Sequence, residues 1–255
     1  NALRYVVAQL VRRPLQTALS ILLLALGVAT LVFVLLVQSQ LVRGLTRDAQ
    51  GIDLVVGAKG SPLQLILSAV YHVDVPTGNV PLAAVEQVRA NRLVKSAIPV
   101  SLGDNFRGFR IVGSEPALIA HYGGQLASGA PWQGRQQAVI GAEVARTTGL
   151  RVGQTFFGAH GLSPDGPVHD DAEYRVVGVL RPSGTVLDRL VLTDLESIWF
   201  VHEGEATDPE ERRILQAERE VTAILVQYAA PLAAAIVPRQ INAERGFRAV
   251  LIRDG

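Results

Sequence analysis

Apolar and polar residues are distributed unevenly along the chain, with one long apolar run near its start. No charged residue occurs between Arg13 and Arg43, and about 20 apolar residues suffice to cross a bilayer as a helix. The centre of the run, residues 18–37, is apolar on all sides rather than along one stripe, which is typical of a helix surrounded by lipid. The pattern therefore predicts a transmembrane helix over residues 14–42.

A cleavable signal peptide is the rival interpretation of this run. A signal peptide has a shorter apolar core and small residues at its cleavage site, whereas here the uncharged run continues through residues 38–42. Charged residues flank the run on both sides: Arg4, Arg12 and Arg13 come before it, and Arg43, Arg47 and Asp48 follow it. The slight basic excess before the run favours a cytoplasmic N-terminus. We expect residues 1–13, with apolar positions at helical spacing, to form a cytoplasmic interfacial elbow helix.

The rest of the chain alternates between shorter helical and extended patterns. A helix is predicted after the N-cap Ser61, with Pro62 in its first turn. Further helices are predicted over 81–90, over 143–148 with its end at Gly149, and over the strongly charged stretch 208–220. A last helix is predicted from Pro231, and Pro238 is expected to break or kink it. Strands are predicted over 51–57, 97–102, 106–112, 138–140, 155–157, 174–180, 190–192 and 221–226. These elements do not alternate regularly, so we expect residues 43–255 to form a mixed α+β extracytoplasmic domain with a small β module.

Composition excludes several classes of function. The formal net charge of +1 over 255 residues argues against a nucleic-acid-binding protein, which usually carries a basic excess on one face. The chain contains no cysteine, which excludes disulfides, a thiol nucleophile and a cysteine-ligated metal. The sequence also has neither a P-loop nor a G-x-S-x-G motif. We therefore predict a protein that is not an enzyme and holds no cofactor, with any ATPase on a separate chain.

One segment carries candidate metal ligands. The residues are His160, His169, Asp170 and Asp171, with His202 as a further candidate. Imidazole and carboxylate groups suit Zn²⁺, but the spacing matches no established zinc motif, and segments rich in Asp, Gly and Pro are ordinary hairpin connections. A plain loop is the favoured interpretation, and no metal ligand is assigned. His72 and His121 are isolated in the sequence and are expected to be satisfied polar residues.

Two apolar features have alternative interpretations. The group Leu63, Leu65, Ile66, Leu67 and Val70 is expected to pack in the core, with a surface facing cargo or a partner as the alternative. In the predicted span, the small residues Ala25, Gly27 and Ala29 would allow another helix to approach closely. Small residues also occur in isolated membrane anchors, so both interpretations stay open.

Three stretches resemble permeases of the macrolide-exporter and lipoprotein-releasing type (MacB/FtsX-like), which are subunits of ABC transporters. The entry, residues 2–29, is similar to the family's basic elbow and first span. Residues 138–155 are similar to its strand, short helix and glycine-containing return, and Tyr174–Leu180 is similar to the strand that closes its β module. The stretches occur in the family's order behind an apolar span, and the similarity they indicate spans most of the chain.

The resemblance implies a function in the inner membrane. Such a permease couples ATP hydrolysis by a partner ABC ATPase subunit to movement of a periplasmic domain during export, extraction or mechanotransmission of amphiphilic cargo. It also implies a second permease copy, membrane lipid and a periplasmic adaptor as partners. Because the family has four spans and this chain shows one, we expect a fragment, incomplete at its C-terminus. The alternatives are a single-span, membrane-anchored periplasmic binding or adaptor protein and a membrane-anchored metal-binding protein.

Overall fold

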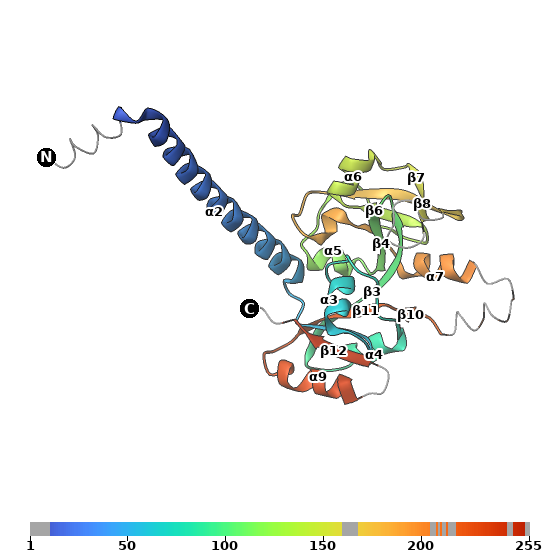
Figure 1. The fold of residues 1–255 in the computed structure, drawn as a ribbon. Coiled ribbons are helices and arrows are strands. Elements are labelled where there is room, and N and C mark those ends of the chain that lie inside the picture. Colours follow the sequence, from blue (N-terminus) through green and yellow to red (C-terminus); the bar gives the residue numbers. More distant parts are fainter. Residues whose placement is uncertain are drawn as a thin grey trace. The chain divides into compact units, whose positions relative to one another are not determined.

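The computed structural model describes residues 11–159, 168–204, 208, 210, 213, 218–243 and 247–252. The chain divides into two compact units, residues 1–45 and residues 46–255. In Figure 1 most of the blue helix belongs to the first unit, and the second unit contains the strands and the remaining helices. The fold is mixed α+β, as the sequence predicts.

Helix α2 spans Pro14–Ala49 and contains 36 residues. Leucine and alanine favour the helix, and the hydroxyl groups of Thr30 and Ser39 donate to backbone carbonyls one turn earlier, so neither is left unsatisfied. Its apolar window is fully exposed, and among the described residues it is the one helix long and apolar enough to cross a membrane. At 1.5 Å per residue the helix is about 54 Å long, against about 30 Å for the hydrocarbon core.

The helix extends beyond the predicted boundary at residue 42. The charged residues that follow continue the helix because arginine is a good helix former in water. Before Pro14, Val11 and Arg12 are helical and Arg13 is not. Most of the predicted elbow helix lies outside the described residues.

The second unit is built on a mixed sheet with short helices on its faces (Figure 1). Its strands are β1 (Leu54–Ala58), β2 (Val80–Pro81), β3 (Val94–Phe106), β4 (Phe109–Ser114), β5 (Leu126–Gly129), β6 (Gln137–Ile140), β7 (Thr155–Ala159), β8 (Val168–Leu180), β9 (Val191–Thr193), β10 (Glu220–Val221), β11 (Ala223–Tyr228) and β12 (Phe247–Leu251). Its helices are α3 (Pro62–Ala69), α4 (Ala83–Arg89), α5 (Ala117–His121), α6 (Ala142–Thr148), the 3₁₀ turn η1 (Val186–Arg189), α7 (Leu195–Gly204) and α9 (Ala233–Ala243).

Strand β3 connects two halves of the sheet. The strand order is β12-β1-β11-β3-β4-β9-β6-β8-β5, and β7 pairs with both β3 and β8. The first part of β3 pairs with β11 and its later part pairs with β4, with a register shift between Leu102 and Asn105. The pairs β4–β9 and β6–β8 are parallel and the other pairs are antiparallel. One long strand thus belongs to both halves.

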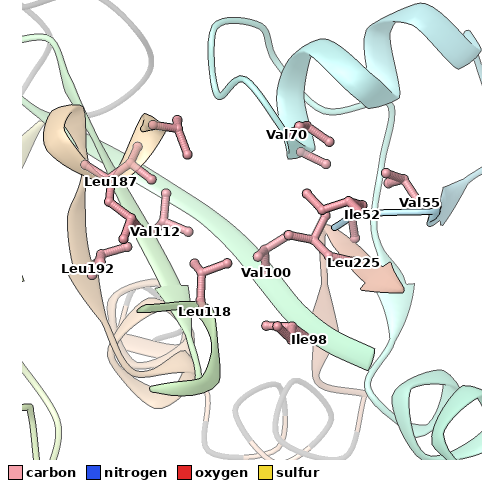
Figure 2. Packing of buried hydrophobic residues seen from close by; sticks show 14 of the residues in the cluster. Ile52, Val55, Val70, Ile98, Val100, Val112, Leu118, Leu187, Leu192 and Leu225 are labelled. Atoms are coloured by element: carbon pink, nitrogen blue, oxygen red, sulfur yellow. The ribbon is translucent and has the colours of Figure 1, made fainter. Parts of the chain in front are cut away.

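The hydrophobic core follows this arrangement. Figure 2 shows Ile98 and Val100 of β3 between Leu225 on one side and Val112 and Leu187 on the other. Val100, Val112 and Leu187 are fully buried, and each contributes roughly 1.5–3 kcal/mol. The cluster therefore joins the two halves of the sheet.

Some local signals in the sequence have the predicted outcome and others do not. The Ser61 side chain accepts from the backbone N–H of Gln64 at 3.4 Å and caps α3, with Pro62 in the first turn. Helix α6 ends at Gly149, which has φ 76°. Pro238 lies inside α9 and does not end it. The predicted charged helix over 208–220 lies mostly outside the described residues, and Glu220 itself belongs to strand β10.

Candidate functional site

The last turn of helix α2 is part of the second unit. The boundary between the units falls after residue 45, and Asp48 and Ala49 are both buried at 6% exposure. The helix ends just before Gly51, whose φ of 76° is the left-handed conformation that terminates helices. A Cβ on Gly51 would lie 3.0 Å from the His121 ring. We call residues 46–50 the helix-end segment.

Asp48 is the central residue of this segment. Its carboxylate forms an ion pair with Arg189 at 3.1 Å, and its backbone carbonyl accepts a 2.8 Å hydrogen bond from the Tyr122 hydroxyl. Burial raises the pKa of Asp48, and the Arg189 charge opposes that rise. Burial and the nearby Asp48 charge raise the pKa of Tyr122, which stays protonated as a donor. The Arg189 charge thus offsets part of the cost of burying the Asp48 carboxylate.

A rigid loop presents the groups that contact the helix-end segment. The Asp188 carboxylate accepts 2.8 Å hydrogen bonds from the backbone N–H groups of Ser183 and Gly184. This fold of the loop exposes the Gly184 carbonyl, which accepts from the Arg47 guanidinium at 3.0 Å. Because Asp188 directly precedes Arg189, the same turn also positions the partner of the buried carboxylate.

Helix α5 supplies the remaining contacts. The His121 Nε2 lies 3.0 Å from the Gln50 carbonyl and donates to it. Burial lowers the pKa of His121, and the hydrogen bond to Gln50 opposes this shift. Side chains from α5 and η1 therefore hold one helical turn. The contacts all run from side chains or a loop carbonyl to the helix-end segment, which they attach to the rest of the second unit.

A second buried polar group lies beneath the connection after α3. His72 has φ 56° and is 7% exposed, and burial followed by the Arg110 charge lowers its pKa to about 3. Arg110 donates to the Asp74 carbonyl at 2.7 Å. His72 Nδ1 and Arg110 Nε have no hydrogen-bond partner in the described part of the chain. His72 is therefore neutral near pH 7, and within the described residues its Nδ1 lacks the partner that the sequence analysis expects of a satisfied histidine.

The candidate metal ligands fall at or beyond the limits of what the structure describes. His160 lies outside the described residues, His169–Asp171 belong to the start of strand β8, and His202 belongs to α7. Nothing is described of their side chains. Among the described residues, no group of three or more His, Asp or Glu could hold a metal ion. The hairpin interpretation agrees with the antiparallel pairing of β7 with β8.

The apolar group after the predicted span divides between core and surface. Leu65 and Val70 are buried at 1% and 0% exposure, whereas Leu63 is 65% exposed. Most of the group therefore packs as the sequence analysis favours. Within α2, a Cβ on Gly27 would meet no atom of the described chain within 4 Å. The alternatives stated for that small-residue stretch stay open.

Sequence reasoning missed the helix-end segment. Asp48 and Arg189 are 141 residues apart, and neither belongs to a motif. Arg47 and Asp48 were interpreted as flanking charges after a membrane span. A charged pair directly behind an apolar run is ordinary, so burial of one member is visible from the fold alone.

Comparisons with known proteins identify one family. The MacB-like periplasmic core domain matches residues 17–244 of this chain. No curated protein matches the sequence. Among solved structures, the periplasmic region of MacB from Actinobacillus actinomycetemcomitans has a TM-score of 0.49 and 11% identity, over 80% of this chain and 91% of that one. The extracellular domain of the noncanonic ABC-type transporter YknZ from Gram-positive bacteria has a TM-score of 0.45 and 10% identity, over 78% and 98%. A domain of a permease protein from Porphyromonas gingivalis, described as putative, has a TM-score of 0.42 and 16% identity, over 80% and 91%.

Proposed function

The chain belongs to the MacB-like periplasmic core domain family, and from that premise we propose that it is a permease subunit of an ABC transporter. Residues 1–13 lie at the cytoplasmic surface, residues 14–42 cross the inner membrane, and the domain that follows is extracytoplasmic. The chain performs no bond chemistry. ATP hydrolysis by a separate ATPase subunit drives movement of the extracytoplasmic domain, which exports or extracts amphiphilic cargo or transmits force.

The helix-end segment carries this proposal. Asp48 is buried and ion-paired, its carbonyl is held by Tyr122, and Arg47 is held by the Gly184 carbonyl. Because these contacts hold the helix-end segment, a shift or rotation of that segment moves the elements of the second unit that are packed against it. A flexible tether would need none of these contacts.

The remaining partners follow from the family. A second copy of the permease is proposed because transporters of this kind work as dimers, and lipid surrounds the exposed apolar face of α2. A periplasmic adaptor is a further proposed partner. Nothing in the described chain favours a metal-binding function.

Site-directed spin labelling tests the proposal. The chain has no cysteine, so Glu173→Cys on the exposed face of β8 gives one label per copy. The full gene product is purified with its ATPase in lipid, and the distance between labels is measured without nucleotide and after trapping with vanadate. We expect the distance to change by several ångströms with the native chain and by much less with Arg189→Ala.

Arg151→Ala, which replaces an exposed arginine away from the helix-end segment, is the matched control and should behave like the native chain. A single unchanged distance would contradict the coupling. The absence of any distance between labels would contradict the dimer. Failure to associate with an ATPase would favour the single-span binding protein instead.

A further inference from the structure

A half-open groove of about 420 Å³ lies on the second unit between α4 and α7. Most of its surface is apolar, and the charges in it are mainly acidic. Its lining residues are Leu82, Val85, Glu86, Arg89, Pro99, Ser114, Glu115, Pro116, Trp132, Asp194, Leu195, Glu196 and Trp199. We call this feature the indole groove.

Both tryptophans of the chain line the indole groove. Trp132 is 7% exposed, and Trp199 is partly exposed. The Trp199 Nε1 donates to the Glu220 carbonyl at 2.7 Å, which fixes the ring. The guanidinium of Arg219 lies 4.7 Å from the Trp199 ring centroid. The groove therefore offers aromatic walls, one of which already binds a cation.

The arginine that lines the groove is fully engaged. Arg89 donates to both carboxylate oxygens of Glu115, at 2.8 and 2.7 Å, and to Glu86 at 2.9 Å. It also donates to the Ala97 carbonyl at 3.0 and 3.2 Å. Two carboxylates thus share one guanidinium, which leaves this side of the groove net negative.

Two further carboxylates lie on the α7 side. Asp194 accepts from the backbone N–H of Ser197 at 2.8 Å and caps α7. Among the described residues, neither Asp194 nor Glu196 has an ion-pair partner. The lining residues include four carboxylates and one guanidinium, a net charge of −3 (−4 + 1), and Arg219 beside the groove reduces this to −2. The whole chain, by contrast, has a net charge of +1.

We propose that the indole groove docks a basic segment of a partner protein. An aliphatic or aromatic side chain of the segment is buried between the two indoles, and flanking lysines or arginines contact Glu86 and Glu196. The groove is half-open, whereas pockets for small molecules enclose most of the ligand. Charge complementarity speeds association and excludes acidic partners. Docking here is independent of the helix-end segment, so either proposal can fail without the other.

Tryptophan emission gives a direct readout because both indoles line the groove. The full chain in phosphatidylcholine vesicles is titrated with a fluorescein-labelled nonapeptide that has one leucine flanked by four lysines. Anisotropy of the peptide reports binding, and protection of the tryptophans from acrylamide reports its place. We expect saturable binding with protection, weakened by salt. The same peptide with glutamates in place of lysines should not bind.

Variants of the exposed acidic residues test the charge. Glu86 has a side chain that is 75% exposed, and Glu196 is also exposed, so neither change disturbs the core. The double variant Glu86→Gln/Glu196→Gln should raise Kd about fivefold, as expected for two exposed ion pairs. Glu173→Gln, at an exposed position outside the groove lining, is the control and should leave Kd unchanged.

Several outcomes would overturn the proposal. The proposal fails if the basic peptide does not bind or if the acidic peptide binds equally well. It also fails if the double variant has the same Kd as the native chain. Binding without protection of the tryptophans would place the peptide elsewhere. Trp132, at 7% exposure, is shielded by the fold, so Trp199, which is partly exposed, is the indole that reports on the groove. Protection of Trp199 from acrylamide in the free chain would mean that the groove is occupied by the chain's own residues or by a second copy, and sedimentation would distinguish these two cases.

Discussion

The ion pair between Asp48 and Arg189 allows the attachment of the helix-end segment to be measured. Arg189→Ala leaves the Asp48 side chain, which is 8% exposed, without its cation. Removing one partner of a buried pair costs roughly 3–5 kcal/mol. The Arg189 side chain is 53% exposed, so water reaches the carboxylate once it is gone. We therefore expect a loss of about 2 kcal/mol, or a fall in Tm of roughly 4–8 °C for a domain of this size.

Asp48→Asn should behave differently. Burial opposes ionisation of Asp48 and raises its pKa, so a neutral amide of the same shape avoids that desolvation cost and should change the stability by less than about 1 kcal/mol. In a chain that already carries Asp48→Asn, the further change Arg189→Ala should therefore lower the stability only slightly. Thermal unfolding of the native chain, the two single variants and the double variant in a nonionic detergent, followed by circular dichroism, measures the coupling.

The pH dependence provides a second check of the same pair. When the pKa of a carboxyl group is higher in the folded chain than in the unfolded chain, the folded chain binds the proton more tightly. The stability that this gives is fully present below the unfolded pKa, and it is lost as the pH rises through the folded pKa. Because Arg189→Ala raises the pKa of Asp48 further, its deficit relative to the native chain should shrink as the pH falls from 7 towards 4. Additive effects in the cycle, or a deficit that grows on acidification, would refute this account.

Other substitutions test individual features of the fold. Burial lowers the pKa of His72 to about 3, so the unfolded chain binds a proton that the folded chain does not, and stability should fall by about 1.4 kcal/mol per pH unit below about pH 6.5. His72→Asn, which tolerates φ 56°, should remove that slope in denaturant titrations at a series of pH values. Gly141→Ala places a Cβ against backbone oxygens of η1 and should cost at least about 3 kcal/mol, whereas Gly134→Ala, which meets nothing within 4 Å, should unfold like the native chain. Gly51→Ala, at φ 76°, should lower the stability by roughly 1–2 kcal/mol, and an unchanged Tm would contradict its role in ending α2.

The elements that could be predicted are those with local signals. The N-cap Ser61 with Pro62 locates α3, and Gly149 locates the end of α6, because each residue satisfies or terminates the backbone of its own turn. The α+β class follows from the irregular succession of such elements. The uncharged run predicts the helix α2 but not its end, since a helix in water continues through charged residues until a residue such as Gly51 stops it.

The features that could not be predicted depend on distant partners. Strands β5 and β12 were not predicted, and β3 is longer than the predicted strand over 97–102, because strand formation depends on neighbours rather than on intrinsic preference. The burial of Asp48 depends on Arg189, and the indole groove depends on the approach of α4 to α7. Sequence periodicity contains no information on such pairings.

The place of β1 in the sheet has a consequence for how the chain is made. Its residues pair on one edge with β11, near position 225, and on the other with β12, near position 250. During synthesis and translocation, both edges of this apolar strand therefore stay unpaired until residues near position 225, and then those near position 250, have emerged. Unpaired apolar strands invite aggregation, and pairings of such long sequence separation form slowly. We expect the nascent chain to need a chaperone in this interval, long after helix α2 has formed.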